Sequence, residues 1–84
     1  MLTELQDAER RALYAEMPAT SIVEHARRVD EKRLPPRERR LHSLVNGRWD
    51  VSALAATSGL GELETLRALR RLMHAGTLRL RTSV

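Results

Sequence analysis

Residues 49–81 read WDVSALAATSGLGELETLRALRRLMHAGTLRLR, and this stretch decides the fold. The apolar residues of Val51–Ser58 recur at helical spacing, and the glycine that follows allows the positive φ of a tight turn. A longer helix is expected from about Gly61 to His74, where another glycine ends it. Residues 77–81 then alternate leucine with arginine, which predicts a short strand with leucine inward. The expected order is helix, turn, helix and strand.

The residues just before this stretch set its first helix in place. Arg37–Val45 predicts a preceding helix, and Gly47 ends it. Asp50 has the position and chemistry of an N-cap, with Trp49 before it and Leu54 at the fourth position of the helix, which is the arrangement of a hydrophobic staple. The staple explains Trp49 without a ligand. We prefer this explanation to the alternative that Trp49 stacks on a base or a partner.

Two further helices are expected ahead of Pro35-Pro36, which interrupts helical structure. The first begins with the capping box Thr3–Gln6 and carries an apolar stripe over Leu2–Met17. The second begins with the capping box Ser21–Glu24 and continues at helical spacing to Val29. Both apolar stripes are narrow. These helices must therefore pack on the rest of the chain or on a second copy of it.

Together these elements predict a mainly α fold, a winged helix-turn-helix with two additional N-terminal helices and a short β-wing. Arg48-Trp49 is the expected partner strand of the wing. Residues 1–34 form an N-terminal helical extension for packing or dimerisation. Residues 35–84 form the winged helix-turn-helix.

The segment from about Arg40 to Leu80 contains LHSLVNGRWDVSALAATSGLGELETLRALRRLMHAG. A glycine precedes a short helix, Ser-Gly-Leu follows it, and a long helix then ends in Ala-Gly. In this order of features the segment resembles the C-terminal helical tail of bacterial PatA-like (PATAN) regulators, over about half the chain. The resemblance implies a winged helix and a regulatory role in a bacterial two-component or motility pathway.

Composition bears on where the chain acts. It has no cysteine, so it forms neither disulfides nor thiolate metal sites, and a reducing compartment suits it. No apolar run approaches the roughly 18 residues of a membrane span, and no signal peptide follows Met1. We therefore expect a cytoplasmic chain with no membrane partner.

Enzyme signatures are missing as well. The sequence has no Gly-rich phosphate loop, no His-Glu-x-x-His motif and no catalytic triad in a recognisable order. His25, His42 and His74 lie on three different expected helices, without the spacing of metal ligands. The sequence therefore predicts no enzyme, no catalytic residue, no metal, no cofactor and no small-molecule substrate.

Charge divides unevenly along the chain. Residues 1–34 contain six Lys/Arg and seven Asp/Glu, and residues 35–84 contain nine Arg and four Asp/Glu, so the two parts carry −1 and +5. The whole basic excess thus lies on the expected winged helix-turn-helix. Such a polarity suits a polyanion or an acidic partner.

The second helix of this motif is the element that reads DNA bases. We expect Thr65, Leu69 and Leu72 to face the core. The outward residues are then Glu62, Leu63, Glu64, Leu66, Arg67 and Arg70. Carboxylates repel phosphates, and leucine offers no hydrogen bond to a base edge. Sequence-specific reading by this helix is therefore poorly supported.

Two functions remain, and DNA binding is narrowly preferred. In this hypothesis arginines clamp the phosphates of double-stranded DNA, with weak sequence preference and a steep salt dependence. The arginines concerned are Arg40, Arg48, Arg67, Arg70, Arg71, Arg79 and Arg81. For each of them, the alternative is a solvated position or an intramolecular pair such as Glu64 with Arg67, because isolated surface pairs are common and weak.

The second hypothesis is a protein-interaction or dimerisation module. Leu63 and Leu66, flanked by Glu62 and Glu64, would form an exposed apolar face that contacts a protein partner or a second copy. The alternative is that the helix is slightly rotated and both leucines belong to the core. The acidic and apolar character of this helix favours the protein-interaction hypothesis, whereas the charge of residues 35–84 favours DNA.

Overall fold

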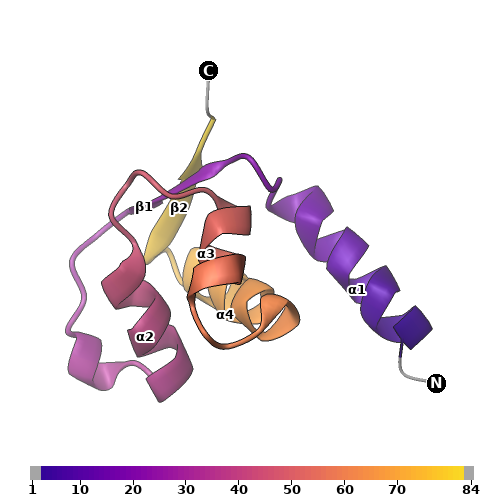
Figure 1. Cartoon of the computed structure of the whole chain (residues 1–84). Coiled ribbons are helices and arrows are strands. Elements are labelled where there is room, and N and C mark those ends of the chain that lie inside the picture. The colour runs from indigo at the N-terminus through magenta and orange to yellow at the C-terminus, as the bar shows by residue number, and fades with distance from the viewer. Residues whose placement is uncertain (1–2, 83–84) are drawn as a thin grey trace.

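The computed structural model describes residues 3–82 of the chain. Within these residues the elements follow one another as α1 (Thr3–Glu16), β1 (Ile22–His25), the 3-10 helix η1 (Glu31–Arg33), α2 (Pro36–Leu44), α3 (Val51–Thr57), α4 (Glu62–His74) and β2 (Leu78–Arg81). Figure 1 shows α2, α3 and α4 grouped together, with the two strands on one side of the group and α1 extending to the other. The chain is mainly helical and has a small antiparallel sheet.

The stretch from α3 to β2 forms as its sequence predicts. The Asp50 carboxylate caps α3 by accepting a hydrogen bond of 2.8 Å from the amide of Ala53. Gly59 has a φ of +79° in the turn between α3 and α4, a conformation that costs glycine little. Trp49 is half-buried and packs against the same core as Leu54, which is fully buried. Packing of Trp49 against the core is compatible with the expected staple.

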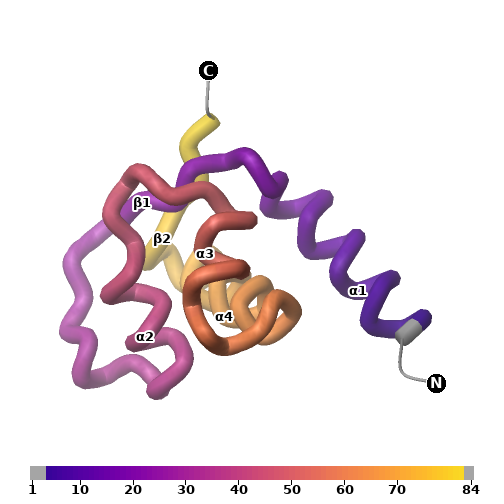
Figure 2. Tube along the Cα trace, viewed as in Figure 1, coloured from indigo at the N-terminus to yellow at the C-terminus, as the bar shows by residue number. Residues whose placement is uncertain are grey.

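The second expected N-terminal helix is wrong, because residues 22–25 form a strand instead. β1 pairs antiparallel with β2, with Val23 opposite Leu80 and Glu24 opposite Arg79. Figure 2 shows these two segments side by side although they lie near opposite ends of the chain. The β-branched pair Ile22-Val23 suits a strand as well as a helix, and the alternating leucines of β2 supply a partner that buries Val23.

The expected partner strand of the wing is also wrong. β2 pairs with β1, and the residues before α3 contribute only one bridge, between Asp50 and Ile22. The amide of Val23 donates to the carbonyl of Trp49 over 3.1 Å, on the edge of β1 away from β2. β1 therefore lies between β2 and the start of α3, and it ties the two ends of the helical group together.

α1 packs on α4 of the same chain. Leu13 and Met17 are buried in the core that α2, α3 and α4 share. Leu5, expected on the apolar stripe, is 75% exposed, because only the last turns of α1 reach this core. The Thr3 side chain, on which the first expected capping box depends, lies outside what the structure describes. Residues on both sides of Pro35 thus contribute to one core.

The helices from α1 to α4 are short and charged. None of those formed within residues 3–82 combines the length and the apolar character that a membrane crossing requires.

Candidate functional site

Burial along α4 decides which of its side chains a partner can reach. Thr65, Leu69 and Leu72 are buried, as expected. The expectation that Leu66 points outward is wrong, because its exposed fraction is 0% and it joins the core. Leu63 is half-buried and packs against the same core. The buried side of α4 is thus wider than expected, since it includes Leu66 and Ala68 as well, and the two leucines form no exposed apolar face.

Arg67, at the centre of the outward side of α4, is held by carboxylates from two helices. Its Nε and Nη2 atoms donate to both carboxylate oxygens of Glu9 on α1, over 2.8 and 2.6 Å. Its Nη1 atom donates to Glu64 over 2.8 Å, so the local pair weighed from the sequence does form. The hydrogen bonds from Arg67 lower the pKa of Glu9. A two-pronged arginine–carboxylate contact of this kind fixes geometry as well as charge.

The other arginines of α4 are paired too. Arg70 lies 3.0 Å from the carboxylate of Glu16 on α1, and Arg71 lies 2.7 Å from that of Glu38 on α2. Glu38 is buried, so Arg71 supplies the charge that its carboxylate needs in that position. To bind phosphates, these arginines would have to give up contacts that they already make.

The two acidic residues at the start of α4 are engaged as well. Glu62 accepts a hydrogen bond of 2.7 Å from the hydroxyl of Tyr14, which fixes α1 beside the start of α4. Burial of the phenol and this hydrogen bond raise the pKa of Tyr14 to about 12. Glu64 accepts from Arg37 of α2 over 2.6 Å. The sequence suggested that Glu62 and Glu64 repel phosphates, and the structure shows that they hold α1 and α2.

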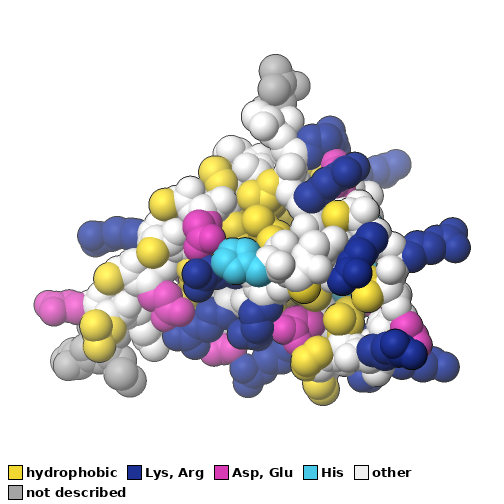
Figure 3. Space-filling view, turned by 180° about the vertical axis from the view of Figure 1, so that it is seen from behind, with side chains coloured by type: hydrophobic (Ala, Val, Ile, Leu, Met, Phe, Trp, Pro, Cys, Tyr) yellow, Lys and Arg dark blue, Asp and Glu magenta, His cyan; other side chains and the backbone are white. Residues whose placement is uncertain are grey.

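These contacts make the outer side of α4 electrically balanced. We call it the α4 face, formed by Arg10, Arg37, Arg67, Arg70, Arg71, Glu9, Glu16, Glu38, Glu62 and Glu64. Five positive and five negative side chains cancel. The surface in Figure 3, seen from behind, likewise shows Asp and Glu among the Lys and Arg side chains. The net positive charge of the chain therefore lies elsewhere.

The arginines of β2 share one carboxylate. Arg79 and Arg81 donate to opposite oxygens of Glu24 on β1, over 2.6 and 2.8 Å. The hydrogen bond from Arg79, with that from Arg81, lowers the pKa of Glu24. Arg81 also donates to the carbonyl of Gly47 over 2.8 Å. Two cations against one anion leave this part of the sheet with a small positive excess.

Arg40 and Arg48, the remaining arginines expected to bind DNA, differ from each other. Arg40 donates to the carbonyl of Ser58 and lies beneath Gly59, so it braces the turn between α3 and α4. Arg48 is exposed and pairs with no carboxylate of residues 3–82. Of the seven arginines expected at a DNA interface, Arg48 is thus the one most available to an outside anion.

The positive excess gathers on residues 27–40, of which the sequence analysis named Arg40 as a phosphate contact without identifying the basic segment as a whole. This segment has seven Lys/Arg and three Asp/Glu, a net charge of +4. Arg28, Lys32 and Arg33 are exposed and, within the part of the chain that the structure describes, make no carboxylate contact. Together with Arg48 we call these residues the basic edge. Figure 3 shows several Lys and Arg side chains along the side of the molecule that lies away from α1.

A charge count over a sliding window would have found this segment. Dividing the sequence at Pro35 cut it in two and hid it, because the acidic residues of α1 offset the first half. Across residues 3–82, no three His, Cys, Asp or Glu side chains are grouped in a way that could hold a metal ion. Comparisons with protein-family models, curated proteins and solved structures find no match for the chain.

Proposed function

We propose that this chain is a non-enzymatic regulatory module of winged-helix type that binds duplex DNA through phosphate contacts from its basic edge. The order α2, α3, glycine turn, α4 and β2 supports the winged-helix assignment, with β1 in the place of the second wing strand. The observation that carries the proposal is the charge of residues 27–40, +4 in fourteen positions. Such a role belongs in the cytoplasm of a bacterial cell.

The proposed interface differs from the one that a reading helix would make. Arg67, Arg70 and Arg71 must break ion pairs before they can meet phosphates, whereas Arg33 and Arg48 need not. The α4 face also offers carboxylates in equal number, which phosphates repel. Binding should therefore rest on the basic edge, and phosphate contacts of this kind carry little sequence information.

The salt dependence of binding follows from the number of cations. Four side chains on the basic edge, each meeting one phosphate, give a slope of log affinity against log salt of about −3.6. Affinity for a mixed-sequence duplex should then fall about 150-fold between roughly 50 and 200 mM salt. Fluorescence anisotropy with a labelled duplex measures this directly. A duplex that does not bind even at the lower salt concentration would refute the proposal.

Two variants with equal net charge locate the interface. Arg33→Ala/Arg48→Ala removes half of the basic edge, and Arg11→Ala/Arg70→Ala removes the same charge from α1 and α4. We expect the first to reduce the salt slope by about two and the second to leave it nearly unchanged. Equal losses in both variants would mean that overall charge, and not the basic edge, drives binding.

A protein partner or a second copy of the chain is the other candidate, and the α4 face favours it. Equal numbers of positive and negative groups beside the half-buried Leu63 suit a protein surface better than a polyanion. Sedimentation velocity of the wild type and of Arg67→Ala tests self-association through this face. A wild-type monomer at high protein concentration, with no change on substitution, would rule out the dimer.

A further inference from the structure

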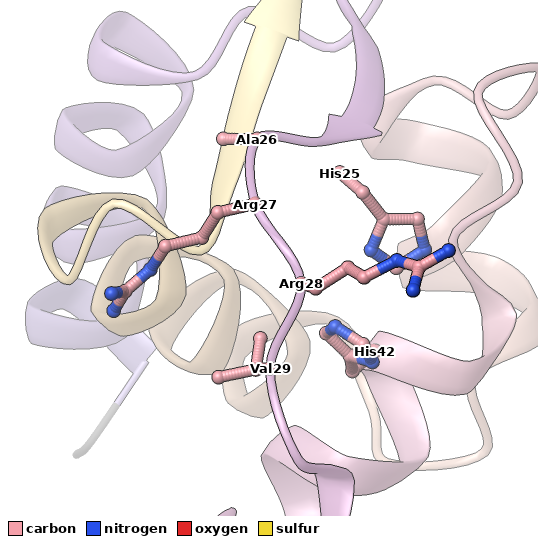
Figure 4. A pocket seen from close by; sticks show the side chains of 6 residues that line it. All are labelled: His25, Ala26, Arg27, Arg28, Val29 and His42. Carbon is pink, nitrogen blue, oxygen red and sulfur yellow. The ribbon is translucent and has the colours of Figure 1, made fainter.

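A cavity of about 520 Å³ opens between the chain that leaves β1 and the helix α2. Its lining residues are His25, Ala26, Arg27, Arg28, Val29 and His42. The volume lies within the range of small-molecule sites in proteins, and the cavity lies apart from the α4 face. Figure 4 shows the two imidazole rings on one side of the cavity and the backbone of residues 26–29 on the other.

His42 is a buried side chain with unused hydrogen-bonding groups. The residue is 8% exposed, and neither ring nitrogen has a hydrogen-bond partner in residues 3–82. The Glu31 carboxylate comes within 3.3 Å of Nδ1 without hydrogen-bond geometry, and Glu31 does not line the cavity. Buried polar groups are nearly always satisfied, so an imidazole at a cavity wall with no hydrogen bond at either nitrogen, beyond the poorly aligned Glu31 contact, indicates a place where a ligand supplies the missing partner.

His25 holds the neighbouring part of the wall in a fixed position. Its Nε2 atom lies 2.8 Å from the carbonyl of Val45, so this nitrogen donates and the ring cannot turn freely. The rings of His25 and His42 lie edge to face, with 4.5 Å between centroids and 63° between planes. The pair forms an angled aromatic wall whose hydrogen-bonding group toward the ligand is His42.

Arg28 supplies the charge at this cavity. Figure 4 shows its side chain extending toward the two rings, whereas Arg27 turns the other way. Arg27 is used elsewhere, because it donates to the carbonyl of Ala75 at the end of α4 over 3.0 Å. A guanidinium beside two imidazoles repels a metal cation and attracts a carboxylate, which it can bind through two parallel hydrogen bonds.

We propose that this cavity binds a small aromatic acid that carries a hydroxyl group. The carboxylate pairs with Arg28, the aromatic ring packs against Val29 and the imidazoles, and the hydroxyl meets His42. A neutral imidazole has one donor and one acceptor, which a hydroxyl can match in either direction. The proposal does not depend on DNA binding, since the site lies within one chain and its test uses no nucleic acid.

The three histidines provide the test, because each gives a separate ring-proton signal in a carbon-resolved NMR spectrum. The probe is 4-hydroxybenzoate, added to the full chain at constant pH. We expect saturable shifts of His25 and His42 and none of His74, which does not line the cavity and lies beside Glu16 of α1. No saturable shift at millimolar concentration, or equal shifts of all three signals, would overturn the proposal.

Variants and analogues then test the chemistry. Arg28→Ala should weaken binding about 10- to 100-fold, the value of a charge-assisted hydrogen bond, and Arg11→Ala should leave it unchanged. Both residues are exposed, so neither substitution removes buried contacts. The neutral analogue 4-hydroxybenzamide should bind the wild-type chain as weakly as 4-hydroxybenzoate binds the Arg28→Ala variant. Equal binding by inorganic phosphate, or unchanged binding by Arg28→Ala, would refute the aromatic-acid site.

Discussion

Replacing Leu66 by alanine tests which side of α4 is inside. Leu66 has no exposed surface and packs in the core between the helices. Truncating a leucine in such a position costs about 2.7–5 kcal/mol, from lost burial and from the cavity left behind. A chain of 84 residues has a total stability of about 4–13 kcal/mol. Leu66→Ala should therefore remove a large part of it and lower Tm by at least about 11 °C.

Urea denaturation followed by far-UV circular dichroism measures this loss, with Leu5→Ala as the matched control. Leu5 is 75% exposed, so its truncation should change the free energy of unfolding by no more than about 0.5 kcal/mol. Leu63→Ala should fall between the two, because Leu63 is half-buried. If the Leu66→Ala variant is as stable as the Leu5→Ala variant, Leu66 points outward. An exposed pair of Leu63 and Leu66, as the protein-interaction hypothesis requires, would then have to be considered again.

Two predictions concern titration. The single tyrosine should ionise in the folded chain at about pH 12, measured by phenolate absorbance, and Glu62→Gln should lower the pKa of Tyr14. Because the folded-state pKa is raised, the Tyr14 hydroxyl stabilises the fold below its usual pKa. This contribution is lost as pH rises toward 12. The pKa values of Glu9 and Glu24 are lowered in the fold, so these groups stabilise the fold above their ordinary pKa and lose that contribution as pH falls from there through the lowered pKa. The urea midpoint should drop on acidification, and less so in Glu9→Gln/Glu24→Gln; equal drops in both proteins would contradict this.

The sequence predicts the second half of this chain well because local signals mark its elements. Asp50 caps α3, and the glycine after Ser58 allows the turn, and neither depends on distant residues. At Ile22-Val23 the local signals mislead, because the capping-box pattern Ser21–Glu24 and the apolar spacing favour a helix although β-branched residues fit a strand as well. The partner of this segment, Leu78–Arg81, is chosen only when the chain folds, and pairing of this kind overrides local spacing.

The candidate site was harder to predict for the same reason. The arginines of α4 were identified, and the local pair of Glu64 with Arg67 was among the alternatives weighed. The pair that matters more joins Arg67 to Glu9, which is far away in sequence, and no local pattern reveals it. The place of the His42 imidazole at the cavity likewise depends on where the chain after β1 passes, which the second expected N-terminal helix placed wrongly.

The position of α1 explains why the charge of the two sequence halves misleads. α1 carries Glu4, Asp7, Glu9 and Glu16 against Arg10 and Arg11, and it packs on the helix that holds Arg67, Arg70 and Arg71. The carboxylates of α1 thus neutralise arginines of α4 in the folded chain. The positive charge that stays unpaired lies in the segment around η1, residues 27–40, which crosses the point where the sequence was divided for the charge count. A polyanion is attracted to the charge that stays unpaired after folding, and in this chain that charge lies beside α2 and not on α4.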